Sequence, residues 1–356
     1  MRPPISMDIA VVTCRRDLSL LTLMLESYAQ FCQIQGSLLI FHDEEDGESI
    51  HRMNLPHNHR LISKQSLGIP GEDFRRQMVI KLNVDHFSDK EYIWVIDSDY
   101  LFVDFISEND FFSDGRPIWL MREWDNEPSL RWRKPTAEVL GFDPPYQFMD
   151  RAQYVFARPV LRRIREAIPQ EKIFYTGMPP SEFIIYGAFA HRYAKNVYEW
   201  RFVDDAAPSL SYEVNQRPPT YADFDPNVKI SAAKGSKYCV FWSYWILSEI
   251  KMVEFLRDAC EAHRICDADL NAYLEAELTA SRDRLIERLC TDRDAIDADR
   301  RAKDDLIGRL SHEIEEINRD RFAKDELVNR LVKEIEVINQ DRDKKEDVIK
   351  LLSGRQ

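Results

Sequence analysis

The stretch of sequence that decides the fold is Tyr92-Ile93-Trp94-Val95-Ile96-Asp97-Ser98-Asp99. A short apolar run bounded by polar residues is typical of a central β-strand that is covered on both faces. A second apolar run, residues 100–103, follows directly, so the Asp97-Ser98-Asp99 triplet lies at the end of a buried strand. Two carboxylates at such a place cannot remain dry and unpaired, because burying an uncompensated charge is too costly. The sequence therefore predicts that these two aspartates bind something.

Strand and helix patterns alternate on both sides of this stretch. Residues 8–13 predict a strand, 18–31 a helix, 37–41 a second strand and 71–87 a helix with apolar residues at a helical period. This alternation is typical of an α/β fold with a largely parallel sheet, whose ligand site lies beyond the carboxyl ends of its strands. Further strands are predicted near 60–63 and over 117–121, 154–157 and 238–242, with helices over 159–168, 181–195 and 244–266.

The composition argues against several classes of protein. The chain has 356 residues and a net charge of −13, whereas nucleic-acid binding depends on clustered Lys and Arg. No apolar run reaches the roughly 18–20 residues that span a bilayer, so no transmembrane segment is expected. Residues 1–13 show no secretory signal. Six scattered cysteines without a Cys-x-x-Cys pair fit reduced thiols. We therefore expect a cytoplasmic protein, and peripheral binding at the inner face of the membrane is compatible with this prediction.

The C-terminal part of the chain is a charged repeat. All seventeen prolines lie at or before Pro226, and residues 278–356 hold 18 basic and 20 acidic side chains. The sequence Asp299-Arg300-Arg301-Ala302-Lys303-Asp304 recurs 21 residues later as Asp320-Arg321-Phe322-Ala323-Lys324-Asp325. Twenty-one residues are three heptads, and one heptad register holds throughout. Its a positions are Ile286, Arg293, Arg300, Ile307, Ile314, Arg321, Val328, Ile335, Arg342 and Ile349, and its d positions are Leu289, Ile296, Lys303, Leu310, Ile317, Lys324, Leu331, Ile338, Lys345 and Leu352.

A strict seven-residue repeat of this length predicts a left-handed coiled coil and hence a partner helix. We therefore expect a homo-oligomer formed through residues 278–356. The a and d positions form the seam of the coiled coil, and its basic layers weaken the seam but fix the register of the helices. The basic layers fit a parallel dimer, whereas Leu306, Leu327 and Val348 at g positions fit a trimer. A single solvated helix and a disordered charged tail are the alternatives.

The Asp-x-Asp pattern at residues 97–99 is suited to a divalent cation. Carboxylate oxygens are hard ligands that Mg²⁺ and Mn²⁺ prefer. Because Mg²⁺ usually takes one or two carboxylates and completes its shell with water and phosphate, the pair forms half of a metal site that a diphosphate would complete. A turn or a helix cap is the alternative explanation of these residues.

Three features together resemble a known family. The first predicted strand ends in Val11-Val12-Thr13-Cys14, a later apolar strand ends in Asp97-Ser98-Asp99, and Ser181-Glu182 opens a predicted helix. In this combination the chain resembles GT-A-type glycosyltransferases, and more narrowly the DxD glycosyltransferases found with bacterial surface-polysaccharide genes. The resemblance covers residues 6–250 and leaves the repeated tail outside.

The resemblance implies a fold and an activity. The expected fold is α/β, with a GT-A (Rossmann-like, nucleotide-sugar-binding) domain over 1–243, a connecting helix over 244–268 and a coiled coil over 269–356. The expected enzyme transfers a sugar from a nucleotide-sugar donor to a glycan or lipid-linked acceptor in surface-polysaccharide synthesis. Mn²⁺ or Mg²⁺ would bridge the DxD carboxylates and the donor diphosphate.

The donor and metal residues follow from the resemblance and from their places in the chain. Asp99 is the expected main metal ligand, and Asp97 contacts the metal or the ribose. His42 and Asp43 end the second predicted strand on the same sheet edge, where a nucleoside contact or a solvated loop explains them. The donor-binding candidates are Thr13, Cys14, Arg15, His42, Arg76, Gln77, Lys81, Asp97, Ser98, Lys234 and Lys237. Within this set, Gln77 and Lys81 are one helical turn apart and share a face, which suits a phosphate or the donor sugar, although an ordinary amphipathic helix edge explains them too.

The acceptor side has one main candidate. Glu182, in the first turn of a helix capped by Ser181, is the expected catalytic base, although a carboxylate there also stabilises the helix dipole. Glu123 and Asp125 are the rival carboxylates. His191, inside a helix, is expected to be packed or on the surface rather than to bind metal, so a third metal ligand is not identified. The tryptophans at 124, 132, 200, 242 and 245 are expected mostly in the core, with one or two lining an acceptor cleft.

Two other functions fit the sequence less well. A nucleotidyltransferase usually has a Gly-rich basic loop after its first strand, and residues 14–17 contain no glycine. A scaffold protein would use the coiled coil for assembly and keep an inactive sugar-nucleotide fold.

Overall fold

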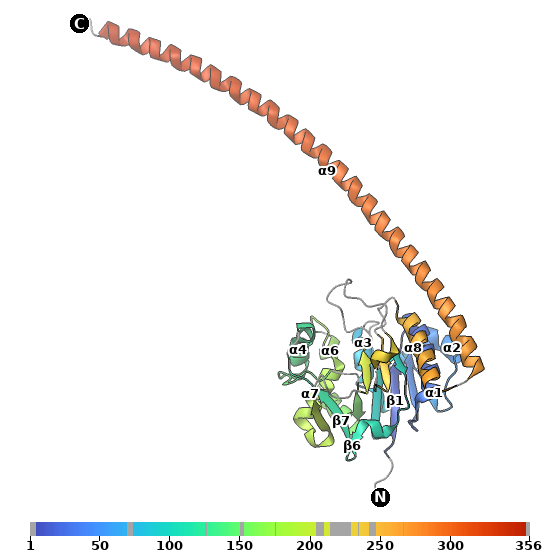
Figure 1. The fold of residues 1–356 in the computed structure, drawn as a ribbon. Helices are drawn as coiled ribbons and strands as arrows, with labels where there is room; N and C mark the ends of the chain where they lie inside the picture. Colours follow the sequence, from blue (N-terminus) through green and yellow to red (C-terminus); the bar gives the residue numbers. More distant parts are fainter. Residues whose placement is uncertain are drawn as a thin grey trace. The chain divides into compact units, whose positions relative to one another are not determined.

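The computed structural model of the chain describes residues 5–69, 74–124, 127–149, 153–174, 176–203, 210–213, 229–233, 235–241, 247–265 and 267–353 (Figure 1). The chain divides into two compact units, Met1–Leu285 and Ile286–Gln356. The first is an α/β unit with mixed sheets, and the second is the greater part of one long helix.

The main sheet has five strands in the order β3-β2-β1-β4-β8. Within this sheet the adjacent strands β3, β2, β1 and β4 run parallel to one another, and β8 pairs antiparallel with β4. The carboxyl ends of the four parallel strands therefore lie along one edge, as the alternation of strand and helix predicts. The strands are β1 (Met7–Val12), β2 (Leu38–His42), β3 (His59–Ser63), β4 (Tyr92–Asp97) and β8 (Val155–Ala157).

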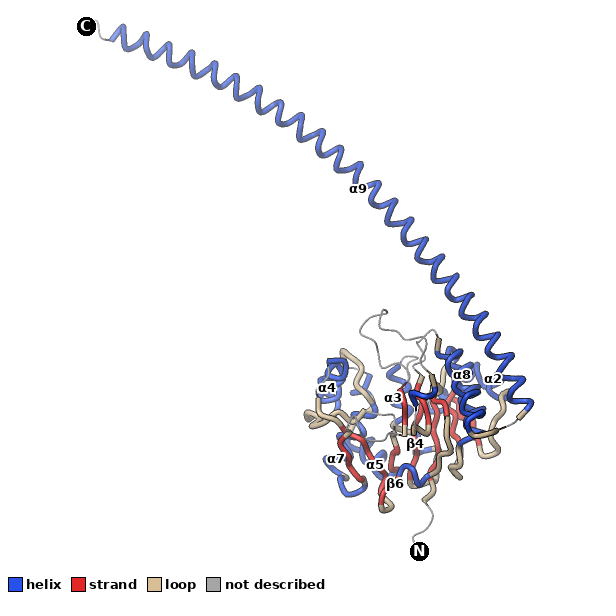
Figure 2. Tube along the Cα trace, viewed as in Figure 1, coloured by secondary structure: helices blue, strands red, loops and turns tan. Residues whose placement is uncertain are grey.

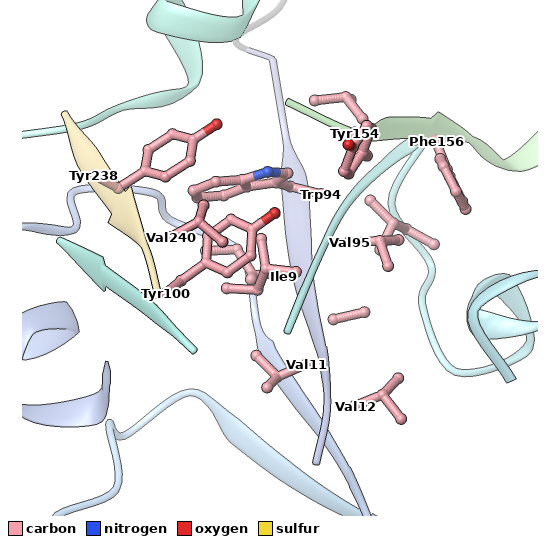
Figure 3. Packing of buried hydrophobic residues seen from close by; sticks show 14 of the residues in the cluster. Ile9, Val11, Val12, Trp94, Val95, Tyr100, Tyr154, Phe156, Tyr238 and Val240 are labelled. Atoms are coloured by element: carbon pink, nitrogen blue, oxygen red, sulfur yellow. The ribbon is translucent and has the colours of Figure 1, made fainter. Parts of the chain in front are cut away.

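The apolar run at residues 93–96 is a central strand covered on both faces. Trp94 has no exposed surface, and its ring lies against Tyr100 and Tyr238 of a smaller sheet (Figure 3). On strand β8 beside it, the ring of Phe156 stacks at 4.0 Å on Tyr186 of a helix. Because successive side chains of a strand point to opposite faces, one face of β4 packs on the smaller sheet and the other on helices.

Two three-stranded sheets complete the first unit. One has the order β10-β11-β5, made of Ser211–Glu213, Tyr238–Val240 and Tyr100–Phe102. The other has the order β6-β7-β9, made of Phe112–Ser113, Arg116–Met121 and Glu199–Phe202. Since β5 starts directly after β4, the Asp97-Ser98-Asp99 triplet joins the main sheet to the first of these sheets.

The helices of the first unit pack in two groups. Helix α1 packs against α8 and β5, whereas α7 packs against α3, α4 and α5. Helices α2 and α8 lie on one side of the strands around β4, and α4 and α7 lie on the other (Figure 2). The helices are α1 (Leu18–Phe31), α2 (Gly47–His51), α3 (Phe74–Lys81), α4 (Glu127–Leu140), α5 (Arg158–Ala167), α6 (Glu171–Phe174), α7 (Glu182–Tyr193) and α8 (Ser248–Ala262). Short 3₁₀ turns lie at Arg15–Asp17, Glu44–Asp46, Lys64–Leu67, Val84–His86, Glu108–Phe111, Lys195–Val197 and Ile230–Ala233.

One helix is shorter than its pattern predicts. The periodicity of residues 71–87 indicates a single helix, but α3 ends at Lys81 and a 3₁₀ turn follows at Val84–His86. The Asn83 side chain donates a hydrogen bond to the Val79 carbonyl at 2.7 Å, so it satisfies one of the carbonyls left open at a helix end. The prediction of a helix to residue 87 is therefore wrong, and Lys81 stands on the last turn of α3.

The long helix α9 spans Ala268–Ser353. Its first turns belong to the α/β unit, where Leu270, Leu274 and Leu278 are buried. From Ile286 onward the aliphatic a and d side chains that the structure describes are between 48% and 66% exposed. The long C-terminal helix is confirmed, and the coiled coil stays a prediction. None of the helices in the described ranges combines the length and apolar character that crossing a membrane requires.

Candidate functional site

Charged and polar residues line the edge where the four parallel strands end. Thr13 follows β1, His42 ends β2, Lys64 follows β3 and Asp97 ends β4. Helix α3 adds two cations to the same region. We call this set the polar edge, which consists of Thr13, Cys14, His42, Asp43, Lys64, Arg76, Lys81 and Asp97.

Lys81 joins two carboxylates at one end of the polar edge. Its Nζ lies 2.8 Å from Oδ1 of Asp97 and 2.8 Å from Oε1 of Glu182. The side chains of Lys81 and Glu182 are each 3% exposed, whereas that of Asp97 is 35% exposed. Asp97 is thus at the solvent rim of this triad, and Lys81 and Glu182 lie deeper.

The triad fixes the charge of Lys81. Burial on its own would lower the pKa of this ammonium, but the carboxylates of Asp97 and Glu182 outweigh burial and hold the pKa above its usual value. The ammonium also lies 4.7 Å from the centre of the Phe183 ring, a favourable place for a cation. Lys81 is therefore a permanent cation whose position is set by two acids.

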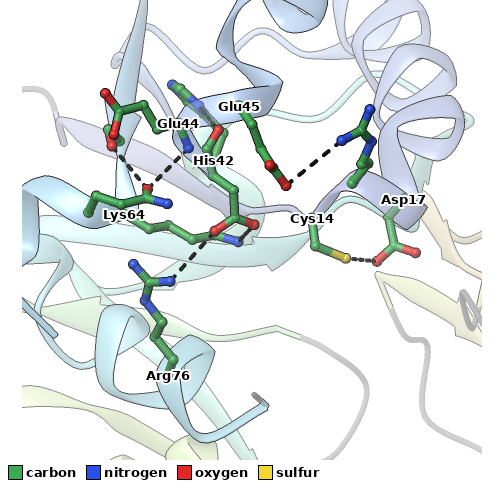
Figure 4. Close-up of polar contacts among 11 residues, drawn as sticks. Cys14, Asp17, His42, Glu44, Glu45, Lys64 and Arg76 are labelled. Atoms are coloured by element: carbon green, nitrogen blue, oxygen red, sulfur yellow. Dashed lines mark hydrogen bonds and ion pairs between the residues drawn. The ribbon is translucent and has the colours of Figure 1, made fainter. Parts of the chain in front are cut away.

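A second cluster occupies the ends of β2 and β3. Asp43 accepts a hydrogen bond from Lys64 Nζ at 2.9 Å and lies 3.7 Å from a terminal nitrogen of Arg76 (Figure 4). Both cations are buried. The ring of His42 is also buried, and its Nδ1 lies 2.8 Å from the Asp43 carbonyl. The cluster brings two positive side chains to the edge where a phosphate group would bind in a fold of this kind.

Residues after β1 offer a hydroxyl and a thiol. The Thr13 hydroxyl is buried and has no hydrogen-bond partner within the described part of the chain. The Cys14 thiol donates a hydrogen bond to Oδ2 of Asp17 at 3.3 Å, and burial together with the Asp17 carboxylate raises the pKa of that thiol. Arg15 is exposed and lies 3.9 Å from Glu45. Of these, Thr13 is the polar atom best placed to gain a bond from a ligand.

The Asp97-Ser98-Asp99 turn supplies two half-buried carboxylates on either side of a buried serine. Ser98 is buried, Asp97 and Asp99 are half-buried, and the Asp99 carbonyl accepts a hydrogen bond from the Phe241 amide at 2.7 Å. No three His, Cys, Asp or Glu side chains come together as a metal site in the described ranges. Two hard oxygen donors fit a Mg²⁺ or Mn²⁺ ion whose remaining ligands are diphosphate and water.

Not every predicted site residue joins the polar edge. Lys237 lies outside it, because β11 pairs with β5 in the antiparallel sense and sets Phe241, not Lys237, beside Asp99. The Lys237 ammonium instead lies 3.0 Å from Oδ2 of Asp104 at the far end of β5. Gln77 is half-buried on α3, and Lys234 lies outside the described residues.

The remaining sequence candidates are in packing or on the surface. His191 packs against Phe148 and Trp200, and burial lowers its pKa, in line with the packing role expected for it. Glu123 is exposed, whereas Asp125, Trp242 and Trp245 lie outside the described residues. Trp124 donates a hydrogen bond to the Pro144 carbonyl, and the Trp132 ring lies near Phe74.

Sequence reasoning missed Lys64 of the polar edge and misjudged the surroundings of Glu182, which lies beneath it. Lys64 directly follows the third parallel strand, and that position was the signal that could have found it. Glu182 does begin a helix capped by Ser181, whose Oγ accepts a hydrogen bond from the Ile184 amide. Its carboxylate, however, is directed at Lys81 in the interior rather than at solvent.

No protein-family model matches the chain, and no curated protein matches it.

Proposed function

We propose that the α/β unit is a metal-dependent glycosyltransferase that uses a nucleoside-diphosphate sugar as donor. The observation that carries the proposal is the polar edge, where acids and cations gather at the carboxyl ends of four parallel strands. Ligands of open α/β sheets bind beyond these ends. A donor of this class needs the three things that the edge offers, namely carboxylates for a cation, cations for phosphate and a buried hydroxyl for the nucleoside.

Each part of the donor has a matching group. Asp97 and Asp99 would hold Mg²⁺ or Mn²⁺, which when bound stabilises negative charge on a leaving diphosphate. Lys64 and Arg76 provide positive charge for the phosphates, and Thr13 provides a hydrogen bond for the nucleoside. The acceptor, a glycan or a lipid-linked sugar, would approach from the solvent side of Asp97.

The Lys81 triad supports this arrangement from below. Lys81 contacts both carboxylate oxygens of Asp97, at 2.8 and 3.1 Å, and so restricts the orientation of that side chain. Glu182 fixes Lys81 in turn. We therefore assign Glu182 a positioning role in place of the expected role as catalytic base, because a 3% exposed carboxylate paired with an ammonium does not reach an acceptor hydroxyl.

A second proposed function is self-assembly through α9. The aliphatic a and d side chains from Ile286 onward are exposed in the single helix, and a strict heptad of such side chains is stable only when a partner helix covers it. The chain would then be an oligomeric glycosyltransferase, with assembly and catalysis in separate units.

Melting of the full chain with a panel of nucleotide sugars, with and without Mn²⁺, tests the enzymatic proposal. A true donor at a hundredfold excess over its Kd should raise the melting midpoint by ~5 °C, because it binds only the folded state. Asp99→Asn and Asp97→Asn should remove the part of this shift that depends on Mn²⁺. Asp104→Asn is the matched control, since Asp104 is about as exposed as Asp97 and is also paired with a lysine, yet lies away from the polar edge.

Two results would overturn the proposal. One is that no nucleotide sugar shifts the midpoint while a nucleoside triphosphate does, which would favour a nucleotidyltransferase. The other is that Asp99→Asn binds the donor as tightly and with the same Mn²⁺ dependence as the unaltered chain.

A further inference from the structure

The seam of α9 contains acidic residues at fixed places beside its basic residues. Each Arg at an a position of the 21-residue repeat follows an Asp at g, and each Lys at the next d position precedes an acid at e. We call each such group of four an ionic station. The three stations are Asp299, Arg300, Lys303 and Asp304; Asp320, Arg321, Lys324 and Asp325; and Asp341, Arg342, Lys345 and Glu346.

Four aliphatic layers separate one station from the next. Between the first two stations these layers are Ile307, Leu310, Ile314 and Ile317, and all four are about half exposed or more. The second interval repeats the pattern with Val328, Leu331, Ile335 and Ile338. The helix thus carries apolar blocks and ionic stations in strict alternation.

Within one chain the stations are only partly neutralised at the surface. Lys324 Nζ lies 2.7 Å from Oδ2 of Asp320, and the same pair recurs at Lys303 with Asp299 and at Lys345 with Asp341. These are one-turn pairs between exposed side chains, which contribute little to stability. They do not explain why an acid also follows each lysine at e.

We propose that α9 pairs with a second copy of itself so that ionic stations lie opposite ionic stations. In a parallel pair an a side chain lies beside g of the partner and a d side chain beside e, and in an antiparallel pair the two neighbours are exchanged. In either case each basic side chain of the seam meets a carboxylate of the other chain, for example Arg321 with the partner's Asp320 or the partner's Asp325. The inference rests on the proposed self-assembly through α9, which it makes specific, and it does not depend on the proposed enzymatic activity.

Matching of stations also selects the register. A shift of one or two heptads would set Arg and Lys against aliphatic layers of the other chain. A buried charge without its counter-charge is strongly destabilising, so these shifted pairings are disfavoured. The stations weaken the seam relative to an aliphatic one but restrict the pairing to alignments that differ by whole repeats.

A charge exchange between two full-length chains tests the pairing. One chain carries Arg321→Glu and Lys324→Glu, and the other carries Asp320→Lys and Asp325→Lys. Each chain alone sets like charges together across the seam, whereas the mixture restores every contact between opposite charges. Repulsion within each helix is the same in pure and mixed assemblies, so the comparison isolates contacts between chains.

The assemblies can be counted by native mass spectrometry of the two chains with tags of different mass. Random exchange gives the mixed dimer at about twice the amount of either pure dimer, and the proposal expects an excess of about tenfold or more. The control chains carry the same changes of net charge outside the seam. These are Arg319→Glu with Arg330→Glu in one chain and Glu316→Lys with Glu326→Lys in the other, at c and f positions.

The outcomes separate cleanly. Selective mixing of the seam variants, with near-random mixing of the controls, supports the pairing. Random mixing of the seam variants, or equal selectivity of the controls, overturns the pairing of stations but leaves self-assembly intact. A monomeric unaltered chain at micromolar concentration overturns both. Circular dichroism of each variant checks that α9 remains helical. Nucleotide-sugar binding by the same proteins reports independently on the α/β unit.

Discussion

The ammonium nitrogen of Lys81 lies 2.8 Å from Oε1 of Glu182, although 101 residues separate the two in sequence. Lys81 ends α3 and Glu182 begins α7, so one ion pair links the ends of two helices beneath the polar edge. Both side chains are buried, and the rim carboxylate of Asp97 shares the same ammonium. The pair therefore connects the stability of the fold to the orientation of the proposed metal ligand.

Replacing Lys81 with Met should destabilise the chain strongly. The change leaves the buried carboxylate of Glu182 without a counter-charge, and breaking a buried pair from one side costs about 3–5 kcal/mol. Urea unfolding at pH 7, followed by tryptophan fluorescence, measures the loss. Glu182→Gln in the Lys81→Met background should recover part of it, because the uncompensated charge is then gone. The less buried pair of Lys237 is the comparison, and Lys237→Met should cost about 1 kcal/mol.

A loss of under about 1 kcal/mol in Lys81→Met would contradict the buried-pair argument. So would additive losses in the double variant, because additivity means that the two side chains do not interact.

The triad of Lys81, Asp97 and Glu182 could be predicted only in part from the sequence. The apolar run before Asp97 is enough to place that carboxylate at a sheet edge, and the helical period before it places Lys81 on the neighbouring helix. The contact with Glu182 could not be predicted, because it depends on how α7 packs against α3. The place of Lys81 on its helix predicts a contact with phosphate or the donor sugar, or an ordinary helix edge, whereas the structure has its ammonium held by two acids.

For two other residues, Lys64 and Lys237, the structure also differs from the prediction because their positions depend on how the strands pair. Strand β3 is weakly apolar and mostly half-buried or exposed, so its pattern drew no attention to Lys64 at its end. Lys237 belongs to the segment 234–237, whose two lysines and one glycine predict a basic loop near the donor diphosphate, but the antiparallel pairing of β11 with β5 directs it to Asp104. Strand order sets both positions, and a single sequence does not show strand order.

The Cys14 thiol should react slowly with alkylating reagents, because Asp17 helps to keep it protonated. Burial, and after it the charge and hydrogen bond of Asp17, raise the pKa of the Cys14 thiol, so little thiolate exists near pH 8. Asp17→Asn removes the two contributions of the carboxylate, lowers the pKa and should speed alkylation by iodoacetamide several-fold at pH 8. Peptide mass spectrometry over pH 7–10 measures the rate, with exposed Cys290 as the internal reference.

In the unaltered chain the Cys14 rate should rise with pH and keep rising above the usual thiol pKa. An equal rate in Asp17→Asn at every pH would show that Asp17 does not control the thiol.

Gly187 should resist substitution although it lies in a helix. An added Cβ would stand 2.4 Å from Cβ of Phe148, a fully buried residue, which is closer than two carbon atoms can approach unless one of them shifts. Gly187→Ala should therefore destabilise the chain by about 1–3 kcal/mol, even though alanine is the better helix former. Gly308 in α9 is the matched control, because nothing lies within 4 Å of its added Cβ and Gly308→Ala should be neutral or stabilising. Thermal unfolding that ranks the two variants in the opposite order would show that the contact with Phe148 relaxes without cost.

The α/β unit should keep its stability without residues 286–356 but lose much of it without the start of α9. Leu270, Leu274 and Leu278 are buried within this unit, and Arg284 lies 3.0 Å from Glu249 on α8. A chain that ends at Leu285 keeps these contacts, so its free energy of unfolding should match that of the full chain to within about 1 kcal/mol. A chain that ends at Asp267 should lose about 5 kcal/mol of that free energy, because each buried leucine contributes about 1.5–3 kcal/mol. Every tryptophan precedes residue 246, so tryptophan fluorescence in urea reports on the α/β unit alone. The chain ending at Leu285 should also sediment as a monomer. Equal stability of the two truncated chains would mean that the three leucines add nothing to the core, and oligomers of the longer one would show that assembly does not require the seam.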